Sequence, residues 1–122
     1  MIYYDYKVKF YKDSEIGNIP VLEYIEKLNE KEKAKVLKYI EFLRQQKGYL
    51  DEPYSKHIKG KVRELRVDFN KKRHRIFYFL FINKTIILLY AFTKNTQKTP
   101  RNEIFRAETN YIDVLKNKQI YE

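Results

Sequence analysis

Three apolar runs between residues 62 and 94 constrain the fold of this chain more than any other feature. They read VRELRVDF, RHRIFYFLF and IILLYAFTK, and the pairs Asn70-Lys71 and Asn83-Lys84 lie between them. Short runs rich in β-branched and aromatic residues, bounded by Asn-containing turns, are typical of consecutive antiparallel strands. We therefore expect a sheet at the centre of the fold.

The side chains of the first two runs divide between two faces. With period-two alternation, the first run presents Leu65, Val67 and Phe69 on one face and Glu64, Arg66 and Asp68 on the other. The second run is apolar on both faces and has arginines near one end, which indicates a central strand covered on both sides. Tyr78 falls opposite Arg75 in this pattern, so we expect its ring in the core.

The rest of the chain predicts elements that cover this sheet. Residues 3–11 alternate like a first strand, Pro20 suits a helix start, and Asn29 with Glu32 resembles a capping box that opens a second helix. Gly48 would stop that helix, 48–61 would be a surface connection, and Pro100 would open a last helix. The expected apolar stripes are Val36, Leu37, Ile40 and Leu43 in the second helix and Ile104, Ala107, Tyr111 and Leu115 in the last.

These elements give the order β-α-α-β-β-β-α, an α+β fold with an antiparallel sheet packed by helices. A chain of 122 residues suits one domain, which we place at residues 1–118, with a frayed and charged end over 119–122. Cysteine is absent, no apolar run reaches about 18 residues, and the amino terminus lacks the apolar core of a signal peptide. We therefore expect a cytoplasmic protein without a membrane partner.

Basic residues are concentrated on the strand-rich segment. The formal net charge is +10, and the segment from Pro53 to Arg101 holds thirteen Lys or Arg but only Glu64 and Asp68 as acids. Such an uneven distribution is typical of a surface that binds a polyanion such as RNA. The alternative is a set of ordinary solvated lysines. Two isolated histidines without an acidic cluster make poor metal ligands, so we expect no metal and no cofactor.

Several short pieces together resemble the motifs of one toxin family. They are Glu64-Leu65-Arg66, Arg75-Ile76-Phe77-Tyr78 and AFTKNTQKTP at 91–100, followed by Glu103-Ile104 and Ala107. Their order and spacing over about residues 54–110 are similar to HigB-type toxins, the phage-associated branch of the RelE superfamily in type II toxin–antitoxin systems. The resemblance implies a RelE-like, microbial-ribonuclease-like fold and a ribosome-dependent mRNA interferase that inhibits translation.

The implied chemistry is metal-independent. The ribose 2′-OH attacks the adjacent phosphate and leaves a 2′,3′-cyclic phosphate, which requires cations around the transition state and groups that transfer protons. Arginine suits the first task because its planar fork grips two phosphate oxygens. The resemblance points to Arg66, Arg75 and Lys94 as catalytic residues, and the need for a proton-transfer group adds Glu64 as a further catalytic candidate.

The remaining site residues leave alternatives open. Arg63, Arg73, Lys98 and His57 are candidates for RNA contacts. Glu64 can act as a base with His57 or a lysine as the acid, or Glu64 can form a cross-strand ion pair while His57 is a solvated loop residue. The chain departs from RelE itself at Val62 and Glu64, where RelE has lysines, and at Phe105, where RelE has an aromatic hydroxyl.

The resemblance also implies partners and competing functions. The expected partners are mRNA, the ribosomal A site and a HigA-like antitoxin with a helix-turn-helix domain, with a toxin–antitoxin heterotetramer as one assembly. One alternative is a non-catalytic ParE-like toxin that inhibits gyrase through protein contacts, since fold alone does not settle function. Another is an inactive remnant that only binds an antitoxin.

Overall fold

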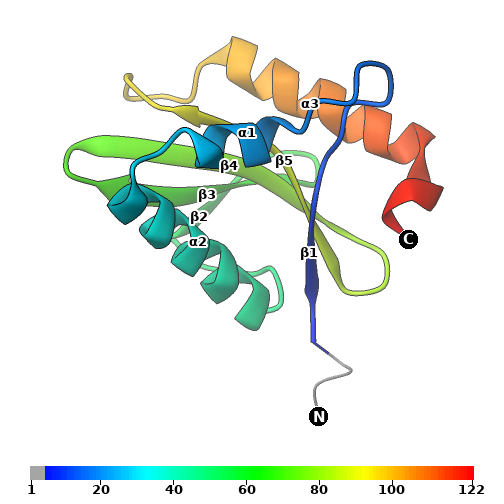
Figure 1. Cartoon of the computed structure of the whole chain (residues 1–122), viewed down its shortest axis with the longest axis horizontal. Helices are drawn as coiled ribbons and strands as arrows, with labels where there is room; N and C mark the ends of the chain where they lie inside the picture. The colour runs from blue at the N-terminus through cyan, green and yellow to red at the C-terminus, as the bar shows by residue number, and fades with distance from the viewer. Residues whose placement is uncertain (1–4) are drawn as a thin grey trace.

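The structure is a computed structural model that describes residues 5–122, and it has an α+β architecture in which helices pack on both faces of one sheet (Figure 1). The elements in chain order are β1 (Lys7–Phe10), α1 (Pro20–Glu26), α2 (Glu30–Gln45), β2 (Ser55–Lys59), β3 (Val62–Phe69), β4 (Lys72–Phe81), β5 (Thr85–Thr93), α3 (Arg101–Lys116) and the short 3₁₀ helix η2 (Lys118–Tyr121). Of the first strand expected at 3–11, Tyr3 and Tyr4 lie outside the described residues. None of the helices in the described range is long and apolar enough to cross a membrane.

The three central strands are confirmed, and their turns have the geometry that tight hairpins require. Strands β3, β4 and β5 are consecutive antiparallel neighbours. Both Asn-Lys pairs have positive φ: 46° and 69° at Asn70 and Lys71, and 57° and 54° at Asn83 and Lys84. In the β3–β4 hairpin, where Phe69 pairs with Lys72, this is the two-residue type I′ pattern, whose twist matches that of the flanking strands. The β4–β5 loop is one residue longer, because Phe81 pairs with Thr85.

The outer strands correct two expectations. The sheet has the order β1-β5-β4-β3-β2, and β1 pairs with β5 in parallel, so the sheet is mixed rather than antiparallel throughout. Strand β2 lies within the segment expected to be a surface connection. Its sequence, SKHIK, exposes most of its side chains at the sheet edge, so it lacks the apolar alternation that marks a half-buried strand.

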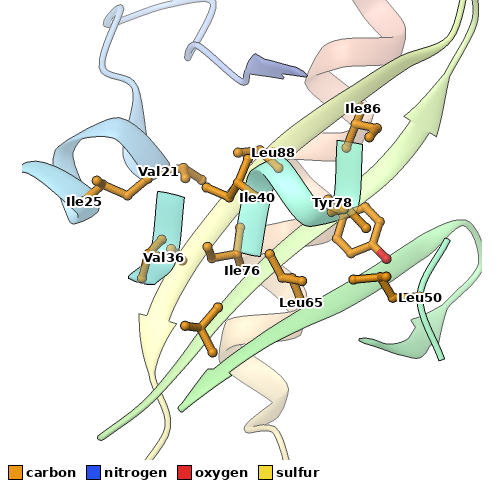
Figure 2. Packing of buried hydrophobic residues seen from close by; sticks show 13 residues of the cluster. Val21, Ile25, Val36, Ile40, Leu50, Leu65, Ile76, Tyr78, Ile86 and Leu88 are labelled. Atoms are coloured by element: carbon orange, nitrogen blue, oxygen red, sulfur yellow. The ribbon is translucent and has the colours of Figure 1, made fainter. Parts of the chain in front are cut away.

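Two apolar cores lie on opposite faces of this sheet. Helices α1 and α2 bury one core, in which Val21, Ile25, Val36 and Ile40 point toward Leu65, Ile76, Tyr78 and Leu88 of the strands (Figure 2). Helix α3 covers the other core, which contains Val62, Phe77, Phe79, Ile87, Leu89, Phe92, Ala107 and Val114. Tyr78 is therefore a core residue, as the sequence predicts.

The predicted helix starts are confirmed, but one residue of each apolar stripe is exposed. The Asn29 carboxamide accepts a hydrogen bond from the Glu32 N–H at 2.9 Å, which caps α2, and α3 begins directly after Pro100. Leu37 and Leu115 are exposed, while Val114 is buried in place of Leu115. The face with which each helix contacts the sheet is therefore narrower than the four-residue stripe expected from the sequence.

A bulge in β5 changes which side chains share a face. Phe77 pairs with Tyr90 and Tyr78 with Leu88, so Leu89 has no partner in β4. One extra residue reverses the alternation of everything that follows it. Leu88 accordingly packs under α1 and α2, whereas Tyr90 and Phe92 pack on the α3 side.

The carboxyl end is folded, in contrast to the frayed end expected over 119–122. Tyr121 is buried in η2, and its hydroxyl accepts a hydrogen bond from the Lys12 N–H at 2.9 Å. The Lys9 ammonium donates to the Tyr121 carbonyl at 2.8 Å. Because Tyr121 is a single aromatic residue among polar and charged neighbours, the sequence pattern does not indicate that it is buried.

Candidate active site

One group of charged side chains lies on the α3 face of the sheet, where β3, β4 and β5 run side by side. Register pairs Arg66 with Arg75 and Asp68 with Arg73, and paired residues in neighbouring strands point to the same face. Lys94 joins them from the residue after β5 because the bulge at Leu89 sets its alternation. We call Glu64, Arg66, Arg73, Arg75 and Lys94 the cationic cluster.

Glu64 lies at the centre of the cationic cluster and is completely buried, with 0% of its surface exposed. Its Oε1 lies 3.3 Å from Arg66 Nε and 3.9 Å from Arg75 Nε. Its Oε2 accepts a hydrogen bond from the Thr99 hydroxyl at 2.9 Å. Removing a carboxylate from water is costly unless donors surround it, so Glu64 and these donors hold each other in place.

The guanidinium of Arg75 is held in place by hydrogen bonds, but not all of its donors have an acceptor. Its Nη1 donates to Asp68 Oδ1 at 2.7 Å and to the His74 carbonyl at 3.0 Å. Its Nε is buried and has no hydrogen-bond partner among residues 5–122. A buried donor left unpaired costs free energy and marks a position where a ligand can supply the acceptor.

Lys94 is the second buried cation of the cluster, after Arg75, with 7% of its surface exposed. Within residues 5–122 its ammonium has no hydrogen-bond or ion-pair partner, so it is available to a ligand. Burial lowers the pKa of Lys94; Glu64 opposes this effect, and the nearby charges of Arg75, Arg66 and Arg73 add to it. A lysine of lowered pKa beside fixed guanidinium groups can both bind a phosphate and exchange a proton.

The other residues proposed for RNA contacts divide between three places. Arg73 belongs to the cationic cluster, and Lys98 is exposed in the loop that connects β5 to α3. Arg63 and His57 pair with each other across β2 and β3, and Arg63 points to the opposite face, where its Nε donates to Ser55 Oγ at 3.2 Å. His57 lies against the Gly60 carbonyl at 2.7 Å and is not brought to the cationic cluster.

Sequence reasoning missed several contacts that shape the site. Thr99 holds Glu64, Asp68 holds Arg75, and a hydrogen-bonded network around His74 lies behind them. The one available signal was His74 itself, a polar residue at a core position of an apolar strand. A cavity of about 600 Å³ between α1 and α3, lined in part by Tyr11, Tyr24, Tyr90 and Phe105, was also not foreseen.

This arrangement defines a class of protein: a small α+β domain that gathers buried cations on one face of a mixed sheet, where they can grip a phosphate. No group of three or more potential metal-ligating His, Asp or Glu side chains occurs in the described part of the chain. The family model of the phage-derived Gp49-like proteins matches residues 23–112. The chain therefore belongs to the Gp49-like family, a RelE-like toxin family of toxin–antitoxin systems, which implies an antitoxin partner. A search of curated proteins found no match.

Proposed function

We propose that this protein is a HigB-like toxin that acts as a ribosome-dependent, metal-independent mRNA interferase. The observation that carries the proposal is that, within residues 5–122, the buried Nε of Arg75 beside Arg66 has no hydrogen-bond partner, and no hydrogen bond or ion pair holds the ammonium of Lys94. Together these groups have the charge and the hydrogen-bond donors that one phosphodiester requires. The fixed guanidinium groups need no reorganisation as charge develops on the phosphate, which is how preorganised sites stabilise a transition state.

The proposed chemistry assigns a role to each member of the cationic cluster. Arg66 and Arg75 hold the nonbridging phosphate oxygens, and the neutral fraction of Lys94 accepts the proton of the ribose 2′-OH. The 2′-oxygen bonds to phosphorus, the bond from phosphorus to the 5′-oxygen breaks, and water protonates that leaving oxygen. Glu64 acts here by holding the two arginines, because Arg66 and Thr99 already occupy its oxygens.

The partner expected from family membership is an antitoxin, and we propose a HigA-like protein with a helix-turn-helix domain. Its acidic side chains would complement the excess of basic residues on the central strands. A heterotetramer of two toxins and two antitoxins is the assembly we propose for the inhibited state.

The test is cleavage of messenger RNA in a cell-free translation extract. The wild-type protein should cut message only when ribosomes are present and leave 2′,3′-cyclic phosphate ends. Lys94→Met, which keeps the stem but removes the charge, should slow cleavage about 10²- to 10⁴-fold, the usual contribution of a proton-transfer group. Lys38→Met, at an exposed position of α2, makes the same change of charge away from the cationic cluster and should cleave normally.

Two results would overturn this proposal. One is intact message together with trapped DNA gyrase, which would favour a ParE-like toxin. The other is equal cleavage by the wild type and Lys94→Met, which would remove Lys94 from the chemistry. Arg75→Lys adds a further check, since it keeps the charge but loses the fork and should also impair cleavage.

A further inference from the structure

A second buried polar network lies on the opposite face of the same strands. Glu32 Oε2 lies 2.8 Å from Nε2 of His74, and the His74 Nδ1 lies 2.6 Å from the Tyr24 hydroxyl. The same hydroxyl lies 2.7 Å from Thr93 Oγ1. This chain of contacts, which we call the His74 network, joins α1, α2, β4 and β5.

The His74 network is buried at its centre and well satisfied. Glu32 and His74 are 2% and 1% exposed, and Glu32 Oε1 also accepts a hydrogen bond from the Asn29 amide at 2.7 Å. Burial alone would raise the pKa of Glu32, but the hydrogen bond from His74 and the charge of Lys72 outweigh it, so the pKa is lowered. Glu32 is therefore an ionised acceptor at neutral pH.

An ionised acceptor at one end gives the His74 network a direction. A carboxylate only accepts, so Nε2 of His74 carries the hydrogen. In the neutral ring Nδ1 then accepts from the Tyr24 hydroxyl, whose oxygen accepts from Thr93. Each hydrogen is used once, and fully satisfied buried networks of this kind hold their members in a single geometry.

The His74 network is attached to the residues that directly precede two members of the cationic cluster. His74 precedes Arg75, and Thr93 precedes Lys94, while His74 and Thr93 are partners in the β4–β5 ladder. Neighbouring residues of a strand point to opposite faces, so a tether on one face controls the position of the next side chain on the other.

Thr93 is the last residue of β5, and beyond it the chain leaves the sheet. The Lys94 N–H still donates to the Arg73 carbonyl at 2.8 Å, but the following loop is exposed. Strand ends open readily when few side chains hold them. The hydrogen bond between Tyr24 and Thr93 is a side-chain contact that holds this end against α1.

We infer that Tyr24 and Thr93 are positioning residues, whose hydroxyl bridge holds the end of β5 against β4 so that Lys94 stays beside Arg66 and Arg75. The consequence for RNA cleavage rests on the proposed function. The effect on the position of Lys94 does not depend on the proposed function, because it follows from the contacts alone.

The ionisation of Lys94 gives a direct measure of this positioning. Its pKa is lowered chiefly because the side chain is buried, and further by the neighbouring guanidinium groups. If the end of β5 opens, Lys94 moves toward water and its pKa rises toward the ordinary value of about 10.4. NMR titration of labelled lysine detects that rise whether or not the protein cleaves RNA.

The experiment compares Thr93→Val, Thr93→Ser and Tyr24→Phe with the wild type. Thr93→Val and Tyr24→Phe remove the hydroxyl bridge and should raise the pKa of Lys94 and slow message cleavage about 10²-fold, the loss expected when a reacting group is misplaced by about 1 Å. Thr93→Ser keeps the hydroxyl and should match the wild type. Thr93 is exposed, so its substitutions test the bridge even where Tyr24→Phe folds poorly.

Tyr11→Phe is the matched control. The Tyr11 hydroxyl donates to Asp113 at 2.6 Å, so this variant also loses one partly buried tyrosine hydrogen bond, but none that reaches β4. It should leave Lys94 unchanged.

The outcomes separate the two proposals. An unchanged pKa of Lys94 in both Thr93→Val and Tyr24→Phe overturns the positioning role, and so does an equal rise in Tyr11→Phe, which would indicate general loosening. A rise restricted to the bridge variants supports the role. A wild-type protein that cleaves no message while that rise is observed would reject the nuclease function and leave the positioning role standing.

Discussion

Among single residues, two buried carboxylates fix the polar side chains on the two faces of the sheet. Glu64 gathers Arg66 and Arg75 on the α3 face, and Glu32 gathers His74 and Asn29 on the other. An unpaired buried charge is strongly unfavourable, so each carboxylate restricts the side chains around it to a few arrangements. The same physics therefore builds the candidate site and the support behind it.

Glu32 should make stability depend on pH in a defined direction. Its folded-state pKa lies below the unfolded value of about 4.3, so ionised Glu32 stabilises the fold above that pH, and this contribution is lost as pH falls through the folded pKa. Glu32→Gln should unfold at lower urea concentration than the wild type at pH 6, and the gap should shrink toward pH 3. Glu30→Gln, at an exposed position of the same helix turn, should show little difference at either pH. A gap that stays constant with pH would contradict this role.

Among the helices and strands, the turns and helix ends place the strictest requirements on backbone conformation. Gly48 follows α2 with φ of 79°, and its N–H donates to the Leu43 carbonyl at 2.9 Å, which completes the helix end. A Cβ on Gly48 would lie 2.1 Å from Leu80 Cδ2, whereas a Cβ on Gly60, with φ of 56°, would meet nothing within 4 Å. The two glycines thus share a backbone requirement and differ in the space around them.

Substituting alanine at each glycine should separate these two effects. Gly60→Ala should lower the free energy of unfolding by about 1–2 kcal/mol, the cost of a left-handed conformation for a residue with a Cβ. Gly48→Ala carries the same cost and must also displace Leu80, so its loss should exceed that of Gly60→Ala by about 1 kcal/mol or more. Urea denaturation of both variants measures the difference, and equal losses would show that Leu80 moves aside freely.

In the molecule as a whole, the first strand and the last helical turn of the described chain are in contact. Strand β1 pairs with β5, and η2 returns to β1 and the residues just after it, where Lys9 and Lys12 contact Tyr121. The carboxyl end therefore closes the α3 core instead of trailing from it.

Removing this anchor should weaken the whole fold. Tyr121→Ala should lower the free energy of unfolding by about 2–4 kcal/mol because it empties a buried aromatic position and frees the Lys12 N–H. Ile120→Ala, at an exposed neighbouring position, should cost much less. Thermal unfolding gives the comparison, and amide exchange at Lys12 should accelerate only in the Tyr121 variant. Equal stability of the two variants would mean that η2 is dispensable.

Local patterns in the sequence predict the centre of this fold and place part of the cationic cluster on one face of a strand. Alternation, the Asn-Lys turns and the Asn29 cap depend only on neighbouring residues, so they are legible without the structure. For the same reason, Arg66 and Glu64 could be placed on one face of β3 from their spacing alone.

The remaining features depend on residues that are distant in the chain. The parallel pairing of β1, the edge strand β2 and the burial of Tyr121 each require a partner segment that no local pattern identifies. The bulge at Leu89 brings Lys94 to Arg75, and the contact between Glu32 and His74 spans 42 residues. Strand periodicity and turn conformation arise from the backbone of a few adjacent residues, whereas the position of Lys94 and the His74 network depend on how the packed elements fill space together.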